Sequence, residues 1–291
     1  MNRLSIADRA KILGMLVEGN SLRSCARMAD VSLNTVTKLL VDLGIACEQI
    51  HNERVINVRV RRLQCDEIWC FVGAKAKNVT PEKKAEGWGD TWTWTGLDAD
   101  TKLCVGYLVG GRGLDWAIDF MKDCASRIKG RVQITTDGHK AYLEAVEEAF
   151  GAEVDYAQLQ KIYGAPAEND TRYSPATCIG CEMKTVSGNP DPKHVSTSYV
   201  ERHNLTMRMG MRRFTRLTNG FSKKVQNHTA MVAIHAVYYN FGRIHKTLRI
   251  TPSMAAGLSD HVWSLEEIIL MADSYAPKLG KRGPYKKRIS N

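Results

Sequence analysis

The order of short apolar segments in the middle of the chain constrains its fold most strongly. Residues 64–72 form an apolar run interrupted by acids, residues 91–98 alternate in period two, and residues 103–109 form a third strand-like segment. An amphipathic helical segment follows, then a fourth apolar strand and a second helical segment. This order predicts an antiparallel meander of three strands, followed by a helix, a further strand and another helix.

That succession is the order of a ribonuclease-H-like core. We therefore expect an α/β (α+β) protein, in which a ribonuclease-H-like catalytic core with a mixed sheet is preceded by a small all-α helix-turn-helix domain. A chain of 291 residues is long enough for one large and one small domain.

Three acidic residues that are far apart in the sequence fall where this fold can bring them together. Asp66 lies in the first predicted strand, Asp137 directly follows the fourth, and Glu201 begins a strongly helical run at 199–215. Carboxylates favour Mg²⁺ or Mn²⁺, and two such ions about 4 Å apart can assist in-line attack on a phosphodiester. We expect these three acids to be the catalytic residues and to hold two ions.

The other acids near these positions are expected to have structural roles. Side chains alternate along a strand, so Glu67 should face away from Asp66. Asp98 and Asp100 flank a turn, where acids are common for local hydrogen bonding.

The first 50 residues have the pattern of three short helices. Ser5 can cap the first helix, Asn20 or Ser21 starts the second, and Ser32 caps a third that ends at Gly44. Two helices, a tight turn and a capped third helix predict a helix-turn-helix. A three-helix cap that only packs on the main domain is the alternative. The residues expected to contact DNA at the start of the third helix are Ser32, Asn34, Thr35, Thr37 and Lys38.

An excess of basic residues favours a polyanionic partner. The chain has 41 Lys and Arg against 31 Asp and Glu, a formal charge of +10. We expect double-stranded DNA as the partner. Further residues expected to contact DNA lie before the first strand and around the Glu201 helix: Arg61, Arg62, Arg208, Arg212 and Arg213.

The expected division of the chain follows from these segments. We expect a helix-turn-helix domain at 1–50, a basic linker at 51–62 and the catalytic core at 63–272. The polar stretch 155–198, rich in Pro, Gly and Asn, predicts a long loop inserted in the core, and 273–291 predicts a flexible basic tail.

Cysteine use and hydropathy indicate a protein of the reducing cytoplasm, associated with the nucleoid. Six of the eight cysteines lie in predicted helices or strands, and we expect neither a secretory signal nor a membrane span. Cys178 and Cys181 have the spacing of half a zinc site, but no second pair follows, so zinc is not expected.

Several stretches of the sequence resemble bacterial transposases of the insertion-sequence-one type, within the DDE superfamily. They are LQCDEIWCFVGAK around Asp66, ITTDGHKAYLEAV around Asp137, TSYVERHNLTMRMGMRRFTRLTNGFSKK around Glu201, and YYNFGRIHKTLRITPSMAAGLSDHVWSLEEII. The resemblance implies Mg²⁺-dependent cleavage at transposon ends, strand transfer into target DNA, and a DDE triad of Asp66, Asp137 and Glu201. The chain departs from some members of this group in one respect. Those members have a cysteine-rich zinc-binding segment before the helix-turn-helix, and this sequence has none.

Two alternative functions remain open from the sequence. One is a ribonuclease-H-like nuclease that cuts without joining, and the other is a sequence-specific DNA-binding regulator derived from a transposase. Because a transposase must hold two ends together, that function also implies a homo-oligomer in the DNA complex.

Overall fold

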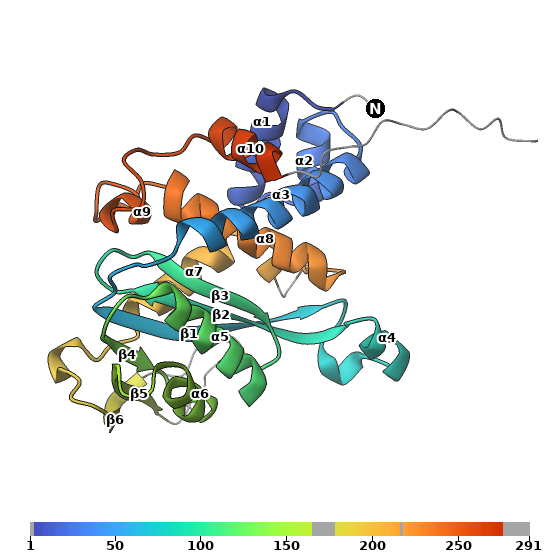
Figure 1. Ribbon diagram of the computed structural model, residues 1–291. Helices are drawn as coiled ribbons and strands as arrows, with labels where there is room; N and C mark the ends of the chain where they lie inside the picture. Colours follow the sequence, from blue (N-terminus) through green and yellow to red (C-terminus); the bar gives the residue numbers. More distant parts are fainter. Residues whose placement is uncertain (1–2, 165–177, 216–217, 276–291) are drawn as a thin grey trace, which may run out of the picture.

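The computed structural model describes residues 3–164, 178–215 and 218–275. Its central element is a six-stranded sheet of order β3-β2-β1-β4-β5-β6 (Figure 1). The strands are β1 Arg62–Val72, β2 Gly89–Asp98, β3 Cys104–Gly110, β4 Val132–Thr136, β5 Val154–Tyr163 and β6 Cys178–Ser187.

The direction of the strands matches the sequence prediction for the core. β1, β2 and β3 form an antiparallel meander, β4 runs parallel to β1, and β5 runs parallel to β4. Two helices, α5 Leu114–Arg127 and α6 Ala141–Phe150, follow β3 and β4 in the chain. The protein is therefore a mixed α/β protein with a ribonuclease-H-like sheet.

Helices cover both faces of the sheet, and neighbouring residues of β2 face different helices. Trp94 packs against Phe120 of α5 and Tyr142 of α6. Thr95, the next residue, donates a hydrogen bond to Asn204 of α7 Ser198–Gly210, on the other face. The period-two pattern of this strand thus fixes which helix each side chain meets.

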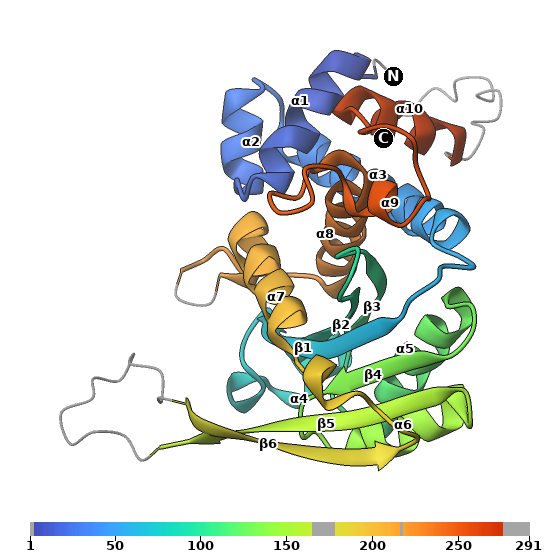
Figure 2. The ribbon, with the colours of Figure 1, turned by 90° about the vertical axis from the view of Figure 1, so that its left-hand side faces the viewer.

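A layer of helices lies next to the sheet, made from both ends of the chain (Figure 2). It contains α1 Ile6–Val17, α2 Leu22–Met28, α3 Leu33–Arg54, α8 Val225–Val237 and α10 Leu265–Tyr275. The first three helices begin at the predicted caps: Ser5, Ser21 and Ser32 each accept a hydrogen bond from a backbone N–H three residues later.

The third helix does not end at Gly44, as the sequence led us to expect, but continues to Arg54. Gly44 is needed for a different reason, because α3 crosses α8 there. A Cβ atom added at Gly44 would lie 2.3 Å from the Cβ of Ala230, so only glycine permits this close approach. The glycine therefore serves helix packing, and the prediction that it stops the helix was wrong.

The stretch 155–198 is not one long loop. β5 and β6 each have ten residues and pair antiparallel, forming a two-stranded arm that extends the sheet (Figure 2). Nine of the ten residues of β6 are exposed and Gly180 is half-buried, which explains the polar sequence that suggested a loop. A short turn, Pro192–His194, then leads into α7.

The remaining elements are short. They are α4 Pro81–Ala85, α9 Pro252–Ala255, the 3₁₀ turns Ala76–Asn78 and Arg212–Phe214, and a π-helical turn Tyr238–Gly242. The helical run predicted to extend to residue 215 thus ends at Gly210. None of the helices among the described residues is both long and apolar enough to cross a membrane. The basic tail was predicted at 273–291, but residues 273–275 form the end of α10, and the residues from 276 onwards lie outside the described part of the chain.

Candidate functional site

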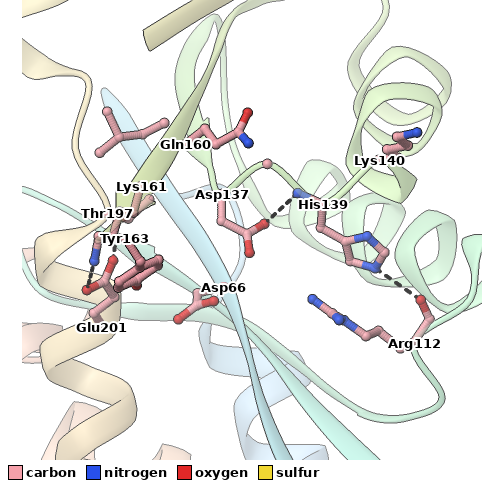
Figure 3. A pocket seen from close by; sticks show the side chains of 12 residues that line it. Asp66, Arg112, Asp137, His139, Lys140, Gln160, Lys161, Tyr163, Thr197 and Glu201 are labelled. Carbon is pink, nitrogen blue, oxygen red and sulfur yellow. Dashed lines mark hydrogen bonds and ion pairs between the residues drawn. The ribbon is translucent and has the colours of Figure 1, made fainter. Parts of the chain in front are cut away.

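The parallel pairing of β1 with β4 brings the first two predicted acids together. Cys65 of β1 lies opposite Thr136, the last residue of β4, so the next residues, Asp66 and Asp137, come side by side at the strand end. Figure 3 shows both carboxylates at the same pocket. This neighbourhood follows from the parallel pairing, because β4 ends beside the middle of β1, where Asp66 lies.

Glu67 is a third acid of this cluster, which the sequence reasoning missed. One carboxylate oxygen from each of Asp66, Glu67 and Asp137 lies within 4.8 Å of the other two. Glu67 does leave β1 on the face opposite to Asp66, towards Tyr142, as strand alternation requires. Its longer side chain nevertheless brings the carboxylate back to the cluster, so the expectation that it lies away from the site was wrong.

The Glu67 carboxylate is buried and has its own set of partners. Its side chain is 3% exposed, Arg112 Nε donates to it at 2.8 Å, and the Tyr142 hydroxyl donates at 3.3 Å. Burial and the charge of Asp137 raise the pKa of Glu67, while the Arg112 hydrogen bond lowers it. A signal for this role was present in the sequence, since Glu67 directly follows Asp66.

Asp66 is the most perturbed acid of the pocket. Burial, together with the negative charges of Glu67 and Asp137, raises its pKa to about 7. The side-chain amide of Asn204 donates a hydrogen bond to Asp66 Oδ2 at 2.8 Å, and this bond lowers the pKa of Asp66. A nearby positive charge would stabilise the ionised carboxylate of Asp66, because it would offset the repulsion by Glu67 and Asp137.

Glu201 lies in the first turn of α7 and lines the same pocket as Asp66 and Asp137 (Figure 3). One of its carboxylate oxygens accepts a hydrogen bond from Lys161 of β5, and the other accepts from Thr197 Oγ1 at 2.6 Å. The carboxylate of Glu201 therefore faces the pocket from the α7 side, with a basic partner from the arm. It does not belong to the three-acid cluster of Asp66, Glu67 and Asp137.

The pocket has a volume of about 710 Å³, and cations as well as acids line it. Arg112, Lys140 and Lys161 are the cations. His139 stacks on Trp94 in the pocket wall, and its backbone N–H donates to Asp137 Oδ1 at 2.9 Å. A cavity with acids at its centre and cations at its wall has the charge pattern that a phosphate group bound through a metal ion requires.

Lys161 lines the pocket and Asn204 contacts Asp66, and the sequence analysis assigned neither of them to the site. Lys161 falls in the segment predicted to be a loop, and its position on β5 brings it to the pocket. Asn204 lies three residues after Glu201 in α7, so the two residues share a helix face. Asp98 and Asp100 have the expected turn role, because Asp98 accepts hydrogen bonds from the backbone N–H groups of Asp100 and Thr101.

The polar residues predicted to contact DNA in the third helix lie at the start of α3. Ser32, Asn34 and Lys38 are exposed, whereas Thr35 and Thr37 are half-buried. Some of their groups have partners inside the helix, since Lys38 forms an ion pair with Asp42 and Thr37 donates to a backbone carbonyl.

The predicted basic residues fall into two groups. Arg61, Arg208 and Arg212 are exposed. Arg62 pairs with Asp100, and Arg213 turns its guanidinium inwards, where it donates to Ser222 at 3.1 Å. Burial lowers the pKa of Arg213 to about 10. These two arginines are thus engaged within the chain, which their sequence positions did not indicate.

Cys178 and Cys181 lie at the start of β6 and are exposed, whereas the other six cysteines are buried. Within the described residues, the only group of three or more metal-ligating side chains is the acidic one, and it contains no cysteine.

Comparison with known proteins finds similar structures. No family model matches the chain, and no curated protein matches it. A piggyBac transposase synaptic complex with hairpin DNA is similar with a TM-score of 0.41 and 11% identity, over 94% of this chain and 73% of that one. A Mos1 transposase paired-end complex with the left transposon end has a TM-score of 0.20 and 15% identity, over 50% and 58% of the two chains.

Proposed function

We propose that this chain is a DNA transposase of the DDE class, related to the insertion-sequence-one type, with Asp66, Asp137 and Glu201 as its catalytic residues. The observation that carries the proposal is their meeting at one pocket from β1, the end of β4 and the first turn of α7. Asp66 and Asp137 are 71 positions apart in the sequence, and Asp137 and Glu201 are 64 positions apart. Only the fold therefore brings the three residues together.

The donor set fits Mg²⁺ or Mn²⁺. Clustered carboxylates are the ligands that these ions prefer. The raised pKa of Asp66 reflects burial first and then repulsion by Glu67 and Asp137, and a divalent cation would relieve that repulsion. Asp66, Asp137 and Glu201 would hold the ions, with Glu67 close enough to contribute. Two bound ions supply activation of the attacking oxygen and stabilisation of the leaving oxygen.

The chain's own cations would orient the DNA strand. Arg112 and Lys140 line the pocket on the side of Asp137, and Lys161 lines it beside Glu201. Each can donate hydrogen bonds to a phosphate oxygen, which places the phosphodiester next to the acids. Exposed residues of α3, together with Arg61, Arg208 and Arg212, would bind the flanking duplex.

The test is a cleavage and joining assay with the full chain and a supercoiled plasmid that carries the DNA flanking its gene. With Mg²⁺ or Mn²⁺ we expect cleavage and joined products. Asp66→Asn, Asp137→Asn and Glu201→Gln should each slow cleavage on the order of a hundredfold or more while DNA binding persists. Asp119→Asn, an exposed acid of α5 outside the pocket, is the matched control.

The possible results separate the proposal from its alternatives. Cleavage that survives in Asp66→Asn and Asp137→Asn would refute the role of the pocket. Cleavage without joined products would identify a nuclease, and specific binding without cleavage would identify a DNA-binding regulator. As a transposase the chain would act as a homo-oligomer on DNA, in the cytoplasm and at the nucleoid.

A further inference from the structure

The strand β6 forms an open edge of the sheet. It is the last strand in the order β3-β2-β1-β4-β5-β6, and only β5 pairs with it among the described residues. Every second residue of β6 therefore points its backbone N–H and C=O groups away from β5, and no other strand among the described residues pairs with them. Figure 2 shows this edge along the outside of the arm.

Large apolar side chains are exposed on the same arm. On β5, Ile162 is 45% and Tyr163 is 56% exposed, and on β6, Ile179 is 68% and Met183 is 42% exposed. An open strand edge with apolar side chains on it is a surface that other chains can join, unless charges prevent the pairing.

The charges on β6 favour one particular pairing. Glu182 and Lys184 are two residues apart, so their side chains lie on the same face of the strand. An antiparallel second copy centred on Met183 would bring Glu182 opposite Lys184 of the partner subunit, and Lys184 opposite Glu182 of the partner subunit. The strand is thus complementary to itself, as a two-fold interface requires.

Among the described residues of its own chain, neither charge lies opposite a charged residue of β5. Glu182 lies opposite Gln160 of β5 and Lys184 lies opposite Gln158, both uncharged. We propose that β6 is a dimerisation strand, which pairs antiparallel with β6 of a second copy of this chain to join the two sheets. This inference does not depend on the transposase proposal, since it rests only on the edge and its charges.

The test measures the mass of the full chain by sedimentation from about 1 to about 100 µM without DNA. The wild type should approach twice the 32.5 kDa of one chain as the concentration rises. Glu182→Lys alone and Lys184→Glu alone each put like charges opposite one another at two places in the dimer, so each should weaken dimerisation about tenfold or more. Lys11→Glu, at an exposed position on α1, is the matched control for net charge and should not weaken it.

Two combinations show that the charges act between chains. The doubly exchanged Glu182→Lys/Lys184→Glu variant should dimerise as well as the wild type. An equimolar mixture of the two single variants should dimerise better than either alone, because the strand with two lysines then meets the strand with two glutamates.

A wild type that stays at the mass of one chain over this range, or single variants that dimerise like the wild type, would overturn the proposal. So would a mixture that dimerises no better than its components. A chain that remains monomeric but still cleaves and joins DNA would leave the proposed function intact, and a dimer without cleavage would leave this proposal intact.

Discussion

Asn204 connects the acidic pocket to the sheet through two buried hydrogen bonds. Its amide nitrogen donates to Asp66 Oδ2, its amide oxygen accepts from Thr95 Oγ1, both at 2.8 Å, and the residue is 1% exposed. Removing one partner of a buried hydrogen bond leaves the other unsatisfied, which costs about 1–3 kcal/mol. Asn204 therefore holds the orientation of Asp66 as well as the position of α7.

We predict that Asn204→Leu lowers the free energy of unfolding by about 1–3 kcal/mol, because the buried Asp66 carboxylate loses its amide donor and Thr95 keeps only its 3.2 Å hydrogen bond to the backbone carbonyl of Asp66. The pKa of Asp66 should also rise, since the hydrogen bond from Asn204 lowers it. Urea denaturation measures the first effect. Asn34→Ala, at an exposed position of α3, should change the stability by less than about 0.5 kcal/mol. An equal loss in both variants would contradict the structural role.

Buried histidines make the stability of the protein depend on pH. Burial lowers the pKa of His51, His228 and His235 from 6.5 to about 3. The unfolded chain therefore binds more protons than the folded chain between pH 6.5 and 3. The contribution of these three histidines to the free energy of unfolding is fully present above pH 6.5 and is lost as the pH falls through this window.

We predict that His235→Leu makes the protein less sensitive to acid. Neither ring nitrogen of His235 has a hydrogen-bond partner among the described residues, so leucine removes a titrating group without breaking a hydrogen bond. Between pH 6.5 and 3 the slope of the unfolding free energy should fall by up to about 1.4 kcal/mol per pH unit. Urea denaturation at a series of pH values measures the slope, and an unchanged slope would show that His235 does not titrate on unfolding.

At the scale of helices and strands, the sequence predicted those parts of the fold that have a local signal. The apolar runs of β1 to β4 and the capping residues Ser5 and Ser32 have such signals, and with them came the meeting of Asp66 and Asp137. β6 was missed because a strand at the edge of a sheet, exposed on both faces, has no apolar alternation. Gly44 was misinterpreted because a glycine that ends a helix and one that lets two helices cross look the same in a sequence.

The crossing of α3 and α8 gives a prediction for Gly44→Ala. Alanine favours a helix over glycine by about 1 kcal/mol, but its Cβ would lie 2.3 Å from the Cβ of Ala230. The overlap must force the helices apart, so we expect a net loss of about 1–3 kcal/mol in thermal or urea unfolding. Adding Ala230→Gly should not restore the stability, because the new Cβ would still lie 2.4 Å from the Cα of residue 230. A stabilised Gly44→Ala would show that this contact is not close.

At the scale of the whole molecule, the helical layer and the sheet share one hydrophobic core. Ile12 of α1, Leu40 of α3 and Ile134 of β4 belong to the same cluster of buried side chains, and all three are 0% exposed. The sequence predicted a helix-turn-helix domain at residues 1–50 because that segment has the pattern of three short helices. A helical pattern does not show whether the apolar faces of the helices pack on the rest of the chain, and here the long α3 packs on α8.

A shared core should make the helical layer and the sheet unfold together. Leu40→Ala removes buried methyl groups from α3 and should lower the unfolding free energy by about 2–5 kcal/mol. Although the change lies in the helical layer, we expect the same shift in the unfolding midpoint from far-ultraviolet circular dichroism, which follows mainly the helices, and from near-ultraviolet circular dichroism, to which Trp94 in the sheet contributes. If the N-terminal helices instead formed an independent domain, the variant would unfold in two steps, and the near-ultraviolet signal of the sheet would keep its original midpoint while the helical signal was lost earlier. The two signals thus decide whether the helical layer and the sheet are separate units or one cooperative structure.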